Sequence, residues 1–100
     1  MAQAKLIRSR AYRNALVRQY QFIAANNPAA AELVIERIED ASRRLKDFPL
    51  SGAGWRHPGT RELVIPGLPY VIIYRVRGDT VELLALFHSA KEPPRTRGRG

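Results

Sequence analysis

Basic and aromatic side chains occur together along the strand-like runs between residues 60 and 88. The residues concerned are Arg61, Tyr70, Tyr74, Arg75, Arg77 and His88. Acid–base cleavage of RNA needs cations that stabilise the charge developing on phosphorus, and side chains that move protons. Arg61, Tyr74 and His88 could supply these groups in principle. An RNA-cleaving site is therefore one hypothesis for this part of the chain.

Packing offers an alternative explanation for the same residues. In a strand, alternation would place Tyr70, Ile72 and Tyr74 on one face and the residues between them on the other. Both faces would then be partly apolar, so aromatic packing accounts for most of this run. His88 lies at the end of a strand whose apolar composition predicts burial, and this position favours a hydrogen-bonded structural histidine.

Metal and thiol chemistry find little support in the sequence. The chain has no cysteine, and its two histidines, His57 and His88, have no carboxylate at metal-ligand spacing. No glycine-rich phosphate loop precedes a helix, and no nucleophile lies on a sharp strand-to-helix turn. We therefore expect neither a metal site nor a cofactor.

Length and charge set the broad class of the protein. One hundred residues suffice for one domain, and 17 Lys and Arg against 9 Asp and Glu leave a net charge of +8. That charge favours an acidic partner, either nucleic acid or protein. No apolar run is long enough to cross a membrane, and the N-terminus does not resemble a signal peptide. We expect a soluble, cytoplasmic protein with no membrane partner.

Hydrophobic periodicity divides the chain into two helices and several strands. Residues 4–8 suit a short strand, and Ser9 suits the N-cap of a helix whose apolar stripe is Tyr12, Leu16, Tyr20 and Ile23. Asn27 and Pro28 suit the start of a second helix. Its stripe runs through Ala31, Val34, Ile38, Ala41, Leu45 and Phe48. Strand-like runs follow at 60–66, 70–77 and 80–88, after a loop that carries Trp55.

These elements predict an α+β fold in the order β-α-α-β-β-β. An antiparallel meander sheet would be covered on one face by an α-helical hairpin. Residues 1–90 would form a single domain, and residues 91–100, which are basic and lack hydrophobic periodicity, would form a flexible tail.

Several ordered motifs connect the chain to a known family. They are Asn27-Pro28-Ala29-Ala30-Ala31, Leu45…Pro49…Gly52, Pro58-Gly59-Thr60-Arg61-Glu62-Leu63, Pro69-Tyr70-Val71-Ile72, Tyr74-Arg75-Val76 and Val81-Glu82-Leu83-Leu84 followed by His88. Over roughly residues 4 to 92 the chain resembles the ParE branch of the RelE/ParE superfamily, the toxins of type II toxin–antitoxin modules of the plasmid stabilisation type. The family fold has the same order of elements.

The resemblance implies two alternative activities. ParE-like members inhibit DNA gyrase by binding it, whereas RelE-like members are ribosome-dependent mRNA endonucleases. In the endonucleases an Arg commonly occupies the position of Val71, and a valine cannot neutralise a phosphate. The resemblance therefore favours a gyrase inhibitor without catalytic residues. The alternative, an endonuclease, would use Arg61, Tyr74, His88 and Lys91.

The resemblance also implies partners and contact residues. A co-encoded antitoxin, acidic and partly disordered, would neutralise the toxin in a hetero-oligomer by laying an amphipathic segment on its apolar surface. The expected antitoxin contacts are Leu16, Tyr20, Ile23, Trp55 and Tyr70, and the expected target contacts are Arg61, Arg75, His88, Lys91 and Arg95. Residues 85–91 depart from the family pattern, since an Arg is lost and Lys91 replaces another. A third hypothesis is therefore a toxin fold with weakened toxicity.

Overall fold

The two helices are started by the capping residues that the sequence offers. In the computed structural model, which describes residues 3–90, α1 spans Arg10–Ala24 and α2 spans Pro28–Arg44. The Ser9 hydroxyl accepts a hydrogen bond from the Tyr12 N–H at 3.0 Å. The Asn27 side chain accepts one from the Ala30 N–H at 3.0 Å. Each cap satisfies a backbone donor that has no partner within its helix.

The second helix ends earlier than its apolar stripe predicts. After Arg44 the backbone N–H groups of residues 45–47 bond to the carbonyls three residues before them, so the chain tightens into turns ahead of Pro49. The change of pitch turns Phe48 away from the stripe, and its side chain is 64% exposed. The prediction that Phe48 continues the buried face of this helix is therefore wrong.

The sheet contains five strands in the order β1-β5-β4-β3-β2. Their bounds are Lys5–Arg8 for β1, Ala53–Gly54 for β2, Thr60–Val64 for β3, Tyr70–Arg77 for β4 and Thr80–His88 for β5. Strands β3, β4 and β5 form the expected antiparallel meander, and Gly78 (φ 56°) turns the chain between the last two. The order β-α-α-β-β-β and the α+β class are confirmed.

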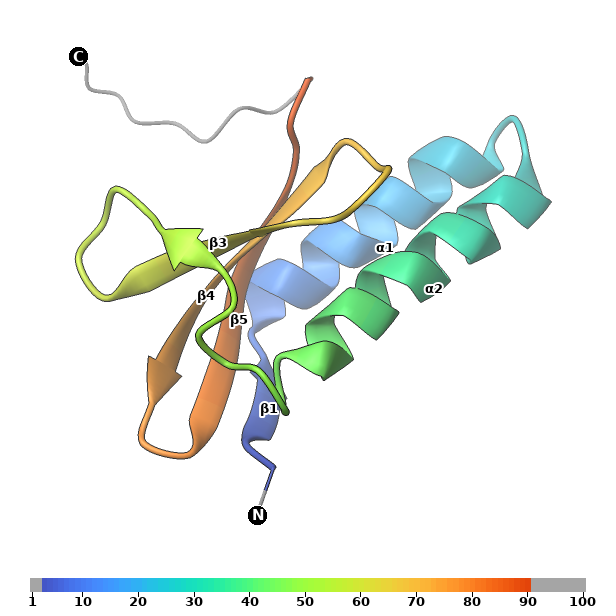
Figure 1. The fold of residues 1–100 in the computed structure, drawn as a ribbon. Helices are drawn as coiled ribbons and strands as arrows, with labels where there is room; N and C mark the ends of the chain where they lie inside the picture. Colours follow the sequence, from blue (N-terminus) through green and yellow to red (C-terminus); the bar gives the residue numbers. More distant parts are fainter. Residues whose placement is uncertain (1–2, 91–100) are drawn as a thin grey trace.

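The edges of the sheet add two features to the expected meander. At one edge β1 pairs with β5 in parallel, with Leu6 opposite Val81, so the sheet is mixed. At the other edge the two residues of β2 pair with Glu62 and Arg61 of β3. Figure 1 shows β1 beside β5 below the helical hairpin. Pattern reading missed the short β2 because a two-residue strand has no measurable period.

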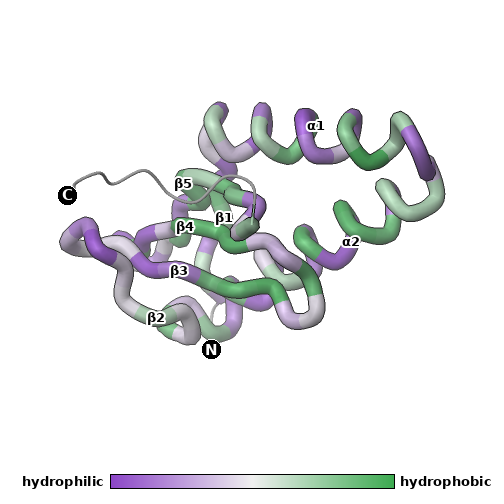
Figure 2. Tube along the Cα trace, turned by 90° about the horizontal axis from the view of Figure 1, so that it is seen from above, coloured by the Kyte–Doolittle hydropathy of each residue, from purple (hydrophilic) through white to green (hydrophobic). Residues whose placement is uncertain are grey.

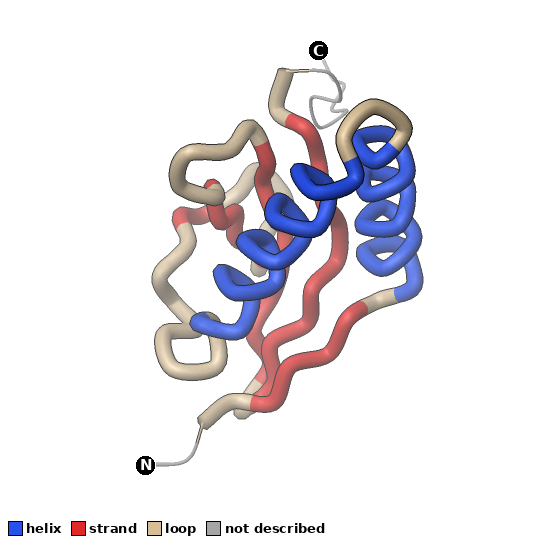
Figure 3. Tube along the Cα trace, turned by 90° about the vertical axis from the view of Figure 1, so that its right-hand side faces the viewer, coloured by secondary structure: helices blue, strands red, loops and turns tan. Residues whose placement is uncertain are grey.

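Both helices cover the same face of the sheet, as Figure 3 shows from the helix side. The buried cluster on that face includes Tyr12, Ile38 and Leu45 from the helical part and Tyr70, Ile72 and Tyr74 from β4. A bulge in β5 changes its alternation, since Ile73 pairs with Ala85 whereas Tyr74 pairs with Leu83. The bulge brings Leu83 and Leu86, three residues apart, to the same core.

No helix within residues 3–90 is long and apolar enough to cross a membrane. The predicted tail at 91–100 lies outside the described residues, and with it lie Lys91 and Arg95.

Candidate functional site

Tyr74 is a buried anchor for the loop that follows α2. Its side chain has no exposed surface. The hydroxyl donates to the Pro49 carbonyl at 2.8 Å and accepts from the Gly52 N–H at 2.9 Å. Arg61 pairs with Tyr74 across β3 and β4, and its guanidinium donates to the Gly52 carbonyl at 2.8 Å. Two of the candidate catalytic residues are thus engaged in holding the backbone of residues 49–52.

His88 lies at a different place on the same face of the sheet. It pairs with Tyr70 across β4 and β5, and the two rings meet edge to face with centroids 5.1 Å apart. Its Nδ1 accepts a hydrogen bond from the Ala90 N–H at 3.2 Å. Tyr70 is four residues from Tyr74 along β4, which corresponds to about 13 Å. The structure therefore does not bring His88 together with Arg61 and Tyr74, and Lys91 lies outside the described residues.

The predicted target contacts are divided between the two faces of the sheet. Arg61 and His88 lie on the side of the helices, whereas Arg75 follows Tyr74 directly and points to the open face. There Arg75 forms an ion pair with Glu82, and Arg77 lies 3.5 Å from the same carboxylate. The hydrogen bond from Arg75 lowers the pKa of Glu82 below its usual value. On this open face the charges of Arg75 and Arg77 are therefore partly neutralised. The remaining predicted target contact, Arg95, lies outside the described residues.

The predicted antitoxin contacts differ in accessibility. Leu16 and Ile23 of α1 are half-buried against the core, and Tyr20 is 37% exposed. Tyr70 is only 3% exposed, and its hydroxyl donates to the Gln19 side chain at 3.2 Å. Burial therefore removes most of Tyr70 from any contact surface in this conformation.

Trp55 borders a separate hollow on the opposite side of the sheet. Its lining includes Arg56, Glu62, Val71 and Phe87, and the Arg56 guanidinium lies 5.2 Å from the centre of the indole ring. Val71, the position where an endonuclease commonly has Arg, contributes a largely buried aliphatic side chain to this hollow. Trp55 and the predicted antitoxin contacts on α1 thus do not form one continuous surface.

An apolar groove beside α2 was missed by the sequence reading. It lies between the end of α2 and the outer edge of β3, with a volume of about 350 Å³. Its lining residues are Ala41, Arg44, Phe48, Ser51, Leu63, Val64 and Pro66. Phe48 and Val64 are 64% and 60% exposed. The signal that could have identified it is the apolar pair Phe48 and Leu50 around Pro49, where no helix or strand buries them.

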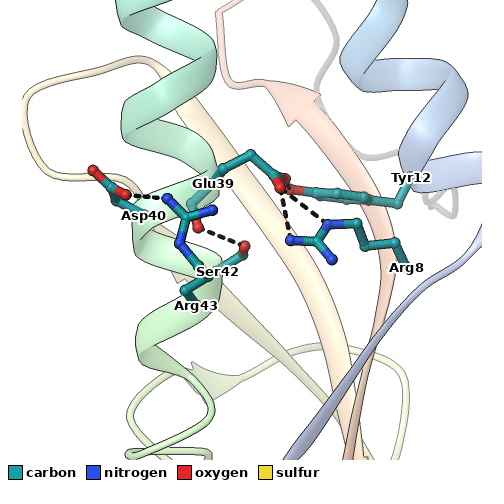
Figure 4. A network of polar contacts seen from close by, with 6 residues as sticks. All are labelled: Arg8, Tyr12, Glu39, Asp40, Ser42 and Arg43. Atoms are coloured by element: carbon teal, nitrogen blue, oxygen red, sulfur yellow. Dashed lines mark hydrogen bonds and ion pairs between the residues drawn. The ribbon is translucent and has the colours of Figure 1, made fainter.

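A network of polar contacts fixes both helices to the first strand (Figure 4). Arg8 of β1 donates twice to one oxygen of Glu39, at 3.0 and 2.7 Å. The Tyr12 hydroxyl donates to the other oxygen at 2.8 Å. Burial raises the pKa of Tyr12, and the negative charge of Glu39 raises it further. This network joins β1, α1 and α2 through one carboxylate.

Among residues 3–90 no group of three or more His, Cys, Asp or Glu side chains could hold a metal ion. The described polar clusters are accounted for by loop anchoring, by the Glu39 network and by the Glu82 ion pairs. The described residues thus offer accessible surfaces to a partner. The surface beside α2 is apolar, and the others carry cationic side chains.

Comparison with known proteins gives consistent results. A family model described as the ParE toxin of the type II toxin–antitoxin system parDE matches residues 6–93. The candidate toxin Y4kP of Sinorhizobium fredii is 40% identical over 73 residues, which cover 73% of this chain and 75% of Y4kP. A solved structure of the chromosomal ParDE TA system from P. aeruginosa superposes with a TM-score of 0.76, covering 86% of this chain and 96% of that chain. At 22% identity, this last likeness shows the fold.

Proposed function

Because the chain belongs to the ParE toxin family of type II toxin–antitoxin systems, we propose that it inhibits DNA gyrase by binding it and that a co-encoded antitoxin neutralises it. The resemblance in the sequence led to the same family, and that expectation is confirmed. The identity of the target and the way in which the toxin is neutralised are what we propose here. Gyrase and a co-encoded antitoxin would both be met in the cytoplasm.

The observation that supports binding over RNA cleavage is the enclosure of the Tyr74 hydroxyl. A general acid or base must reach its substrate within hydrogen-bond distance, directly or through one water. The Tyr74 hydroxyl instead bonds to Pro49 and Gly52 inside the protein, and Val71 adds no cation nearby. His88 is about 13 Å further along the sheet. The side chains that an acid–base mechanism would need are therefore far apart, or their polar atoms already form hydrogen bonds within the protein.

The target surface would be formed by basic side chains that remain accessible. We assign it to Arg75 on the open face of the sheet and to Arg61 and His88 on the helix side, together with Lys91 and Arg95, which lie outside the described residues. Arg61 and Arg75 keep part of their surface accessible. Their planar guanidinium groups suit carboxylates of a protein target.

The antitoxin would cover apolar surface that the fold leaves exposed. The groove between α2 and β3 offers Phe48, Leu63 and Val64 as apolar contacts and Arg44 at its border. An acidic, amphipathic segment of the antitoxin would bury these apolar side chains and form an ion pair with Arg44. On α1, Tyr20 would contribute with Leu16 and Ile23 beside it. Trp55 would be a separate contact on the opposite side of the sheet, and Tyr70, which is 3% exposed, would add little surface. The net charge of +8 would accelerate capture of such a segment.

The test is DNA supercoiling by gyrase on relaxed plasmid, with the purified 100-residue chain titrated in the presence of ATP. We expect concentration-dependent inhibition with trapped cleaved DNA, and reversal by the antitoxin. The variant Lys91→Gln/Arg95→Gln should inhibit less strongly. Its matched control, Arg43→Gln/Arg44→Gln, removes the same charge from α2 and should inhibit as the parent chain does.

Two results would reject this proposal. If folded protein that binds its antitoxin leaves supercoiling unchanged, gyrase is not the target. Cleavage of ribosome-bound mRNA should then be measured, with Arg61→Gln and His88→Gln as variants. If neither activity is found and expression leaves growth unaffected, the chain has lost its toxicity and retains only antitoxin binding.

A further inference from the structure

The N-terminal third of the chain carries charge of one sign. Five basic residues occur before the first acidic residue, Glu32, and three of them lie on α1. Arg8 is neutralised by Glu39, as described above. In contrast, within residues 3–90 no carboxylate lies within ion-pair distance of Arg10, Arg13 or Arg18. The cationic charge of α1 is therefore not used inside the described fold.

These arginines share the solvent face of α1. With 100° per residue, Arg10, Arg13 and Arg18 fall within a sector of about 140° that also contains Asn14, Val17 and Gln21. All six side chains are exposed. The opposite side of the helix is buried through Tyr12, Ala15 and Gln19. Figure 2 shows α1 at one side of the molecule, with hydrophilic segments on its outer turns.

Helix stability does not explain the positions of these charges. The first turn of α1 contains no acidic residue, and Arg10 and Arg13 lie near this positive end of the helix dipole. α2 has the favourable arrangement, with Arg43 and Arg44 in its last turn. Arg10 and Arg13 are thus placed where they oppose the dipole, and an anionic partner would compensate for that.

We propose that this face of α1 binds the phosphate backbone of duplex DNA. Arginine forks match phosphate oxygens, and the amides of Asn14 and Gln21 add donors on the same face. Val17 and Ala24 are the apolar residues of α1 in the sector, and of the two only Val17 is exposed, whereas an amphipathic protein segment needs a row of apolar anchors. A helix of 15 residues is about 22 Å long and fits the major groove in width. The inference is independent of the gyrase proposal.

The test uses the 100-residue chain and a fluorescently labelled 20-base-pair duplex, with anisotropy measured at several salt concentrations. The variant Arg10→Gln/Arg13→Gln/Arg18→Gln should bind at least about tenfold more weakly near 0.1 M salt. The slope of log K against log[salt] should fall by about 2 to 3, because up to three phosphate contacts are lost. The control Lys5→Gln/Arg43→Gln/Arg56→Gln removes the same net charge from other surfaces and should retain most of the affinity.

Three results would overturn the inference. The first is absence of DNA binding by the parent chain at low salt. The second is an equal loss in both triple variants, which would indicate an effect of net charge alone. The third is unchanged DNA affinity with weakened antitoxin binding in the α1 variant, which would assign the face to an acidic protein segment. Since no gyrase is present, these results do not depend on the gyrase assay.

Discussion

Arg61 and Tyr74 face each other across β3 and β4 and hold the same loop from two directions. The Tyr74 hydroxyl bonds to the Pro49 carbonyl and the Gly52 N–H, and the Arg61 guanidinium bonds to the Gly52 carbonyl at 2.8 Å. Both polar groups of the Gly52 backbone are thereby satisfied by side chains of the sheet. The relationship explains why a tyrosine and an arginine that suggest catalysis in the sequence have a structural role here.

Gly52 should be the least tolerant position of this loop. A Cβ there would lie 2.6 Å from both the Glu62 carbonyl oxygen and the Tyr74 hydroxyl. Because one of these atoms belongs to backbone, we expect Gly52→Ala to lower the free energy of unfolding by about 1–3 kcal/mol. Urea denaturation measures the change. Gly54→Ala is the matched control, since nothing lies within 4 Å of its Cβ, and equal effects of the two variants would contradict the packing argument.

Tyr74→Phe separates a structural tyrosine from a catalytic one. Loss of the hydroxyl leaves the Gly52 N–H and the Pro49 carbonyl without this partner, so we expect destabilisation of about 1–2 kcal/mol. Inhibition of gyrase per folded molecule should stay unchanged at a temperature where the variant is folded. Tyr20→Phe, at a partly exposed position, should alter stability by less than about 0.5 kcal/mol. A fully folded Tyr74→Phe protein without toxicity would indicate that the hydroxyl takes part in the activity.

Glu39 and Asp40 are neighbouring carboxylates with different importance for stability. Glu39 accepts hydrogen bonds from Arg8 and Tyr12, and its side chain is 18% exposed. Its removal in Glu39→Ala leaves a guanidinium and a hydroxyl without their partner, so we expect a loss of about 2–3 kcal/mol. Asp40→Ala breaks only the exposed pair with Arg43 and should cost less than about 1 kcal/mol. Thermal unfolding of both variants tests this, and similar losses would argue against a central role for Glu39.

The raised pKa of Tyr12 predicts a loss of stability at alkaline pH. In the unfolded chain this phenol ionises near its usual pKa of about 10, whereas the folded protein retains the proton to higher pH. The stabilisation by Tyr12 is therefore fully present below pH 10 and decreases above it, by at most about 1.4 kcal/mol per pH unit. Urea denaturation between pH 8 and pH 11 measures the slope. Tyr12→Phe should show a shallower decrease, and identical slopes would contradict the predicted shift.

Much of the fold follows from local signals in the sequence. The period of α1, the caps Ser9 and Asn27 and the Gly78 turn are decided by residues close in the chain, and the structure confirms them. Apolar periodicity was insufficient at two places. Phe48 fits the stripe of α2, but the turns before Pro49 expose it. The parallel pairing of β1 with β5 joins segments about 75 residues apart, which no local period reports.

The candidate site shows the same difference between what the sequence determines locally and what only the tertiary structure decides. Residue types by themselves indicated the family and a basic, partner-binding protein, because charge and motif are properties of the chain. The roles of Arg61, Tyr74 and His88 depend on which backbone groups and rings come to lie beside them, and strand register decides this. Register placed the Tyr74 hydroxyl inside the molecule and separated His88 from it along β4. Tertiary packing likewise left Phe48 and Val64 exposed beside α2, since burial is a property of the assembled layers.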